Sequence, residues 1–233
     1  GMVRESNQDS YTTGELPNGV AWAVVCDGMG GAAGGNVASS TAVKVIAEQI
    51  TSSFRPGMSA NSIKNMMVSA INAANISVYD ISCSNSELYG MGTTVVCAIV
   101  MEHTAYIAHA GDSRAYIVSH GALTQLTRDH SVVQELVEHG KITALEAKRH
   151  PNKNIITRAV GVSREILVDF CEQEMKDGDV LLLCTDGLTN FVESDEMCDL
   201  TKDDMFYEFA ERLVDRANKN GGGDNVTVVA VTY

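Results

Sequence analysis

The chain has 233 residues, of which 45% are hydrophobic and 20% are charged, and its formal net charge is −13. This length and composition are typical of one globular domain with a substantial core. The acidic balance would repel phosphate backbones and anionic lipids, which argues against a nucleic-acid-binding protein or a membrane-surface protein. No apolar run approaches the length that spans a bilayer, no signal peptide is recognisable, and the six cysteines form no C-x-x-C pair. We therefore expect a cytoplasmic protein with reduced thiols and without membrane contact.

The sequence predicts two long helices early, a cluster of strands in the middle, and strands with a helix at the end. Residues 20–26 (V-A-W-A-V-V-C) form a short apolar run that predicts a buried strand. Helices are expected over about 36–49 and 59–81, where apolar residues recur at three- and four-residue spacing. Further elements are predicted as strands at 93–100, 105–110, 115–118, near 123, 166–170, 180–184 and 226–231, and as a helix at 205–217. Adjacent strands joined by short turns favour antiparallel pairing, so the predicted fold is an α+β sandwich with helices on its outer faces.

Three aspartates lie where a predicted buried strand meets a turn. Asp27 and Asp186 each follow such a strand and precede a glycine, and Asp224 lies just before the last strand. A fourth, Asp9, lies near the start of the chain. Converging carboxylates cannot all stay ionised and unpaired, and hard cations such as Mg²⁺ or Mn²⁺ resolve this conflict. Taken singly, an aspartate before a glycine is more often an ordinary turn.

Eight short motifs follow one another along nearly the whole chain. They are V-R-E-S-N-Q-D-S at 3–10, D-G-M-G-G at 27–31, G-M-G-T-T at 90–94, A-G-D-S-R at 110–114, L-T-R-D-H-S at 126–131, I-T-R-A-V-G at 156–161, L-L-C-T-D-G-L at 182–188 and G-G-D-N-V-T at 222–227. In these motifs and in their order, the sequence resembles the metal-dependent type 2C protein phosphatase family in its short bacterial form. One D-G-x-G-G is weak evidence, whereas eight ordered motifs are highly specific.

The resemblance implies an enzyme that hydrolyses phosphoserine and phosphothreonine in proteins, with metal-activated water at a dinuclear Mn²⁺ or Mg²⁺ centre. It implies a four-layer αββα sandwich of two mostly antiparallel sheets, in a single catalytic domain over 1–233 with a flap at about 128–165. It also implies phosphoprotein substrates, an opposing Ser/Thr protein kinase and a role in bacterial signalling. We expect a monomer, because no amphipathic stripe is left over to require a dimer.

The resemblance assigns metal-binding roles to residues at matching motif positions. Asp27 would bridge two metals, and the carbonyl of Gly28 would bind one of them. Asp186 and Asp224 would complete the ligands of the other. Asp112, in A-G-D-S-R, would join Asp186 in binding a third, weaker metal.

Residues near the start of the chain carry implied roles in substrate binding and catalysis. Arg4 would hold the substrate phosphate, which suits a bidentate guanidinium, and Asp9 would act through a metal-bound water. Met29 stands where some family members have a histidine proposed as the general acid, so a metal-bound water is the expected proton source. The chain begins three residues before Arg4, without the strand that precedes this motif in the family. We therefore expect Arg4 and Asp9 to be held less firmly, and phosphate to bind less tightly.

Two other functions compete with this interpretation. Residues 28–33 fit the dinucleotide-binding pattern G-x-G-x-x-A, and Glu48 lies about twenty residues on. However, no strand signal returns until about residue 93, so a βαβ unit cannot be drawn. The second alternative is a catalytically impaired relative that only binds phosphoproteins, against which the intact set of four aspartates argues. The histidines at 103, 109, 120, 130 and 150 are expected to be structural or exposed, because Mg²⁺ and Mn²⁺ sites favour oxygen ligands.

Overall fold

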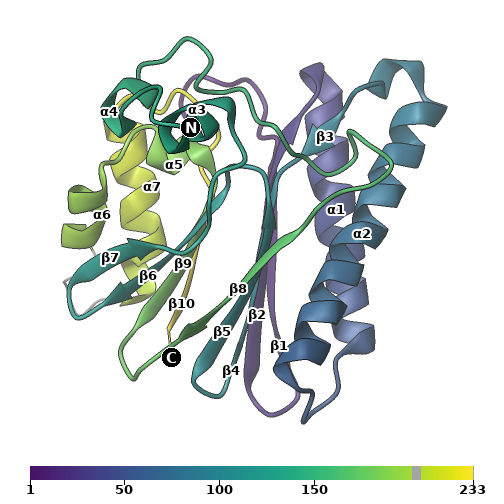
Figure 1. Ribbon diagram of the computed structural model, residues 1–233, viewed down its shortest axis with the longest axis vertical. Helices are drawn as coiled ribbons and strands as arrows, with labels where there is room; N and C mark the ends of the chain where they lie inside the picture. The colour runs from purple at the N-terminus through teal and green to yellow at the C-terminus, as the bar shows by residue number, and fades with distance from the viewer. Residues whose placement is uncertain (201–205, 233) are drawn as a thin grey trace.

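Two antiparallel β-sheets pack face to face, and helices cover the outer face of each sheet (Figure 1). The computed structural model describes residues 1–200 and 206–232, except for the side chains of residues 32 and 33. The first sheet runs in the order β1 (Asp9–Leu16), β2 (Val20–Met29), β4 (Val95–Met101), β5 (Thr104–Ala110) and β8 (Asp169–Glu174), with β3 (Gly92–Thr93) paired to β2. The second sheet runs in the order β10 (Val228–Thr232), β9 (Val180–Cys184), β6 (Arg114–Ser119) and β7 (Ala122–Gln125). The predicted α+β sandwich of four layers is thereby confirmed.

The helices divide between the two outer faces. The first sheet is covered by α1 (Gly31–Ser53) and α2 (Ala60–Ser84), and η1 (Ser86–Leu88) follows them. The second sheet is flanked by α5 (Asp186–Thr189), α6 (Ser194–Leu200), η2 (Phe206–Glu208) and α7 (Phe209–Lys219). The N-cap of α2 is Ser59, whose side chain accepts a hydrogen bond from the N–H of Ser62 and so satisfies a free donor of the first turn. None of the described helices is both long and apolar enough to cross a membrane.

Three hydrophobic clusters fill the three interfaces between the four layers. Strand β2 shows why its sequence is apolar without alternation, because it contributes to two of these interfaces. Val24 and Cys26 pack toward α1 and α2, whereas Ala23 and Val25 pack between the two sheets. A strand that is buried on both faces reads as a continuous apolar run, as the sequence analysis assumed for 20–26.

Some predicted boundaries are wrong, for physical reasons that the structure makes clear. Strand β1 was not predicted, because it is a polar edge strand in which only the two end residues, Asp9 and Leu16, are buried. The strand predicted at 166–170 is displaced, since β8 begins only at Asp169. The apolar side chains of Ile166 and Val168 instead pack against the helical side of the first sheet. The predicted helix at 205–217 corresponds to α7, and residue 205 lies outside the described part of the chain.

The segment between β7 and β8 contains the predicted flap, at about 128–165. It holds two short helices, α3 (Val132–Glu138) and α4 (Ala144–Ala147), which lie beside one end of the two sheets (Figure 1). Thr93 and Val160 exchange two backbone hydrogen bonds of 3.0 and 2.8 Å, so the end of the flap is attached to β3. A second bridge, between Ser131 and Ile156, closes the flap upon itself.

Candidate metal centre

A cavity of about 550 Å³ opens where parts of the chain that are distant in sequence meet. Every predicted metal ligand lines it, and so does the predicted phosphate-binding arginine. These residues are Arg4, Asp27, Gly28, Asp112, Asp186 and Asp224. The aspartates enter from the end of β2, the turn before β6, the start of α5 and the loop before β10. The structure therefore brings together in one place what the sequence indicated only as separate strand ends.

Asp27 is fixed on three sides by backbone and hydroxyl contacts. Its N–H donates to Oγ1 of Thr94 at 2.9 Å, and its carbonyl accepts from the N–H of Thr94 at 2.8 Å. The hydroxyl of Thr93 donates to the same carbonyl at 2.8 Å. These contacts hold the end of β2 in one position, so the carboxylate projects from a rigid base.

Asp186 and Asp224 are held by neighbouring polar groups. Nδ2 of Asn190 donates to Oδ2 of Asp186 at 2.9 Å. The guanidinium of Arg4 grips Asp224 with two hydrogen bonds, from Nε to Oδ1 at 2.9 Å and from Nη2 to Oδ2 at 3.0 Å. Within the described chain, this pairing leaves Nη1 of Arg4 uncommitted. The guanidinium is largely exposed, so a phosphate in the cavity could reach it.

Asn225 ties the start of the chain to the loop that carries Asp224. Its Oδ1 accepts from the N–H of Gln8 at 2.9 Å, and its Nδ2 donates to the carbonyl of Ser6 at 3.0 Å. The expectation that Arg4 would be held loosely is therefore wrong for this structure, because both its side chain and its segment are anchored.

Asp9 is held just as firmly, but it lies behind the cavity and does not line it. The side chain is buried, and Oδ2 accepts hydrogen bonds from the hydroxyls of Thr185 at 2.9 Å and Thr227 at 2.7 Å. Oδ1 is also buried and has no partner in the described chain. Burial raises the pKa of Asp9 to about 6, although the two hydroxyls act in the opposite direction. The unpartnered oxygen fits a water at the back of a metal site.

The carboxylates of the cavity repel one another, so their arrangement favours a bound cation. Burial raises the pKa of Asp27 well above its usual value, and the charges of Asp9 and Asp186 raise it further. Burial and the charge of Asp186 raise the pKa of Asp112 to about 7, and burial followed by the charge of Asp224 raises that of Asp186. Buried carboxylates that repel one another are stabilised by a divalent ion, and an all-oxygen ligand set suits Mg²⁺ or Mn²⁺. The residues present therefore fit such an ion.

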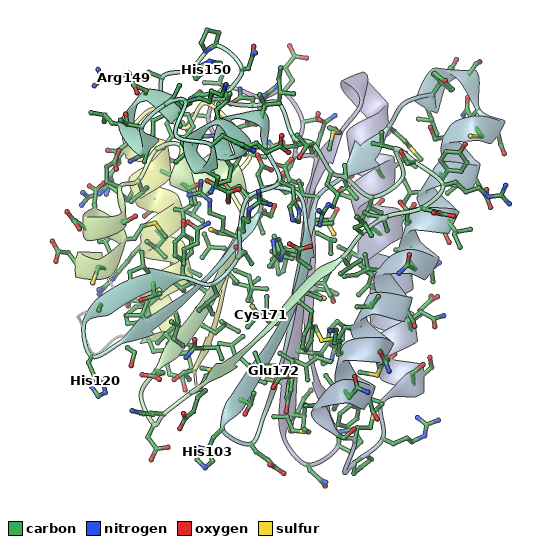
Figure 2. All side chains as sticks on the ribbon, in the orientation of Figure 1. His103, His120, Arg149, His150, Cys171 and Glu172 are labelled. Carbon is green, nitrogen blue, oxygen red and sulfur yellow. The ribbon has the colours of Figure 1, made fainter. Side chains whose placement is uncertain are left out.

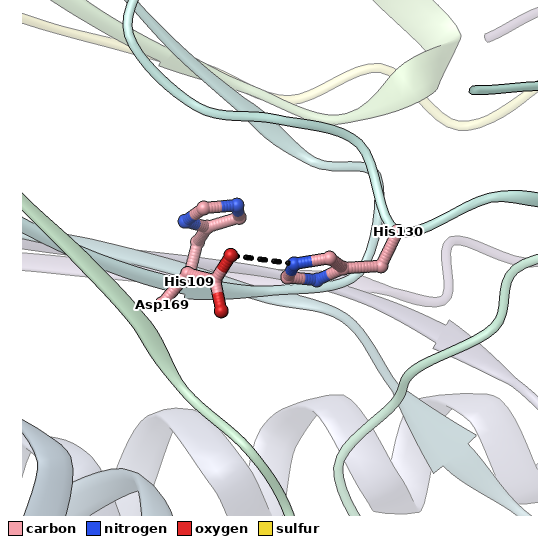
Figure 3. Close-up of side chains that lie close together, drawn as sticks. All are labelled: His109, His130 and Asp169. Atoms are coloured by element: carbon pink, nitrogen blue, oxygen red, sulfur yellow. Dashed lines mark hydrogen bonds and ion pairs between the residues drawn. The ribbon is translucent and has the colours of Figure 1, made fainter. Parts of the chain in front are cut away.

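Two histidines and an aspartate form a separate cluster beside the cavity (Figure 3). The rings of His109 and His130 are stacked with centroids 4.8 Å apart, and Nε2 of His130 lies 3.1 Å from Oδ2 of Asp169. The N–H of Gly111 donates to Nδ1 of His130 at 3.0 Å, so the proton of this ring lies on Nε2 and is donated to Asp169. His109 faces the carbonyl of Arg128 with Nε2, at 2.9 Å, which places its proton there.

These tautomers decide what the cluster can do. Both nitrogens of His130 are committed to hydrogen bonds, and a neutral ring in this state has no lone pair for a metal. Of the four ring nitrogens in the cluster, only Nδ1 of His109 is left without a partner in the described residues. We therefore interpret the cluster as an anchor for the turn before Asp112. This contact joins residues 19 positions apart in the sequence and was not predicted. His103 and His120 lie in hairpin turns at the opposite end of the sheets from His150, which is in the flap (Figure 2).

Sequence reasoning missed the polar residues that support the aspartates. Thr94, Thr185, Thr227 and Asn225 all lie inside the quoted motifs, and the last three lie within three residues of a predicted ligand. A buried carboxylate needs donors, so hydroxyls and amides near each aspartate are candidates, but the sequence does not indicate which of them will contact it.

Comparison with known proteins agrees with this geometry. A family model described as Protein phosphatase 2C matches residues 3–227. The serine/threonine phosphatase stp of Listeria monocytogenes is 38% identical over 232 residues, which cover 99% of this chain and 92% of that protein. The structure of the S. agalactiae serine/threonine phosphatase is similar with a TM-score of 0.93 and 33% identity, covering 100% of this chain and 95% of that one. The catalytic domain of the phosphatase PstP in complex with 2 manganese ions is similar with a TM-score of 0.84 and 33% identity, over 99% of this chain and 93% of its own.

Proposed function

Because the chain belongs to the protein phosphatase 2C family, and is thus a metal-dependent serine/threonine phosphatase acting on phosphoproteins, we propose that the cavity holds a dinuclear centre. The ions would be Mn²⁺ or Mg²⁺, and the ligands would be Asp27, the Gly28 carbonyl, Asp186 and Asp224. The observation that carries this proposal is the convergence of partly buried carboxylates on one cavity, with the pKa values of Asp27 and Asp186 raised. Asp112 would join Asp186 at a third, weaker site.

When bound, such ions supply an activated water and positive charge that offsets the charge of the phosphoryl group. The protein side chains perform the other tasks. Arg4 would bind the substrate phosphate through Nη1, which its pairing with Asp224 leaves available. Asp9 would accept a hydrogen bond from water through its unpartnered Oδ1 and so orient that water from behind.

Protonation of the leaving serine or threonine oxygen is assigned to water. Met29 lines the cavity at the position where a histidine would stand in other family members. A thioether has no proton to donate, so this side chain cannot act as a general acid. The open cavity gives water access to the leaving oxygen.

The decisive test compares hydrolysis of a phosphothreonine peptide with Mn²⁺, with a chelator, and with Mn²⁺ and the Asp186→Asn protein. We expect activity that needs the metal and falls by about a hundredfold or more in the variant. Calorimetric Mn²⁺ titration of both proteins gives a readout besides activity, and the variant should bind fewer or weaker ions. Tight Mn²⁺ binding without any hydrolysis would instead favour a protein that only binds phosphoproteins.

We further propose that the catalytic domain extends over 1–233, with the flap at about 128–165, and that the protein acts as a monomer opposing a Ser/Thr protein kinase. The support for the domain is the face-to-face packing of both sheets around one cavity, and the support for the kinase is the likeness to serine/threonine phosphatases, whose substrates a Ser/Thr kinase phosphorylates. Light scattering of the purified protein would test the monomer, and a mass of twice the chain's would contradict it.

A further inference from the structure

A second cavity adjoins the catalytic one. It has a volume of about 470 Å³ and lies between the end of β2 and the segment that leads from the flap to β8. Met29 and Ile156 line both cavities, so the two hollows share a wall. We call the second one the apolar groove and define it by the side chains of Met29, Ile156, Ala159, Val162, Ile166 and Leu167.

The groove exposes large apolar side chains that no described part of the chain covers. Leu167 is 74% exposed and Val162 is 53% exposed. Tyr89 is 80% exposed and precedes Gly90, which also lines the groove. Scattered exposed apolar residues are ordinary, but several of them gathered around a hollow indicate a binding surface. Covering them with an apolar group would remove this surface from water.

The wall of the groove is rigid, so little ordering is needed when it binds a ligand. Gly161 has a positive φ of 88°, and its N–H donates to Oδ1 of Asn75 at 2.7 Å. The amide of Asn75 donates in turn to the carbonyls of Ser163 at 2.9 Å and Arg164 at 3.1 Å. One buried side chain of α2 therefore fixes the turn that presents Val162. A preformed surface loses less entropy on binding than a mobile loop does.

Charge distinguishes this groove from the opposite side of the active site. Its ionisable side chains are Arg158, which is paired with Asp169 at 2.6 Å, and Glu165, which is exposed. Neither would attract an acidic residue. A third cavity, of about 240 Å³, shares Asp112 and Asp186 with the catalytic one and is lined by Lys148 and Lys153. Arg114 and Asp129 also line this third cavity, and Lys148 is paired with Glu193, so positive and negative charges are mixed there.

We propose that the apolar groove is a substrate subsite that binds an apolar side chain of the phosphoprotein, close in sequence to the phosphorylated residue. This inference rests on the proposed catalytic centre, because the shared wall of Met29 and Ile156 connects the groove to it. An extended chain advances about 3.3 Å per residue, so a side chain one to three residues from the phosphothreonine spans adjoining hollows. The preferred substrates are phosphopeptides with a leucine-like neighbour and without an acidic one at that position.

The test uses phosphothreonine peptides in which each of the three positions on either side of the phosphothreonine is leucine, serine or aspartate in turn. We expect one position at which leucine raises kcat/KM roughly tenfold over serine, the range that a hydrophobic contact provides, and at which aspartate lowers it. Leu167→Ser and the double variant Val162→Ser/Leu167→Ser should abolish this preference. Leu145→Ser is the matched control, because Leu145 is an equally exposed leucine, 65%, in the flap and outside the groove.

Hydrolysis of p-nitrophenyl phosphate, which has no flanking residues, tests the catalytic centre without involving the apolar groove. It should be the same in the wild type and in all three variants. Loss of this activity in the wild type with Mn²⁺ would count against the catalytic centre itself. Normal activity on the small substrate, together with equal kcat/KM for the leucine and serine peptides, would overturn the groove proposal alone. A leucine preference that survives in the double variant, or a preference for aspartate at every position, would overturn it as well.

Discussion

Replacing His130 with alanine tests whether the histidine cluster anchors the turn before Asp112. His130 is 2% exposed and contacts Gly111 twice. Its ring accepts the N–H of Gly111 at 3.0 Å, and its own backbone N–H donates to the carbonyl of Gly111 at 2.9 Å. His130→Ala removes the ring contact and the link to Asp169, and it leaves the backbone contact in place.

The expected loss of stability follows from these contacts. The N–H of Gly111 becomes a buried donor without an acceptor, which costs about 1–3 kcal/mol. The space left by the imidazole and the lost stacking on His109 add to this, since removing a large buried ring costs about 3–5 kcal/mol. An imidazole is smaller than the rings behind that figure, so we expect a total of about 3–5 kcal/mol. His130→Asn should recover part of it, because Oδ1 of asparagine can accept from Gly111 in place of Nδ1.

Urea unfolding of the three proteins measures the effect, with unchanged m-values as the sign of two-state behaviour. His139→Ala, which removes an exposed histidine of the flap, is the control and should lie within about 0.5 kcal/mol of the wild type. The Mn²⁺ concentration for half-maximal activity should rise more in His130→Ala than in His130→Asn, because the turn carries Asp112. An alanine variant as stable as the asparagine variant would refute the anchoring role of the ring.

Three further predictions concern the same region and the supports of the site. Burial lowers the pKa of His130, so below about pH 6.5 the unfolded state binds more protons than the folded state. The wild type should therefore lose stability as pH falls from 7 to 5, and its unfolding free energy should approach that of His130→Asn in paired urea titrations. Gly161→Ala should cost about 3 kcal/mol in thermal unfolding, because Gly161 has a positive φ and its added Cβ would lie 2.2 Å from a valine of α2. Gly140→Ala, which also has a positive φ but open space around it, should cost about 1 kcal/mol. Thr227→Val should cost about 1–3 kcal/mol in urea unfolding, because Asp9 loses a 2.7 Å hydroxyl donor, and an unchanged midpoint would contradict this.

Most of the fold could be predicted from the sequence, because local hydrophobic patterns indicate most of its helices and strands. Strand 180–184 and helix 59–81 are examples, since their apolar residues alone specify a buried strand and a one-sided helix. Strand β1 could not be predicted in this way, because this polar edge strand has little apolar content. Its place is set by pairing with β2, which is a tertiary effect.

The candidate ligand residues were predicted to lie together, but the residues that support them were not predicted. The candidate ligands were identified by motifs that lie at strand ends, which is local information. The supports depend on contacts between distant residues, such as the hydroxyl of Thr227 on Asp9 and the backbone of Gly111 on His130. No pattern in the sequence indicates which of many threonines will face a buried carboxylate. The same holds for the apolar groove, whose walls come from separate segments.

The union of Arg4 with Asp224, and of Asn225 with Ser6 and Gln8, has a consequence for biosynthesis. The cavity takes residues from both ends of this sequence, so it cannot form until the ribosome has released the segment around Asp224. A nascent chain that already contains Asp27 and Asp112 therefore lacks Asp224, and its Arg4 lacks the carboxylate that holds the guanidinium. Dephosphorylation by this protein begins only after folding has joined the first and last segments of the sandwich, so a partly folded chain is inactive.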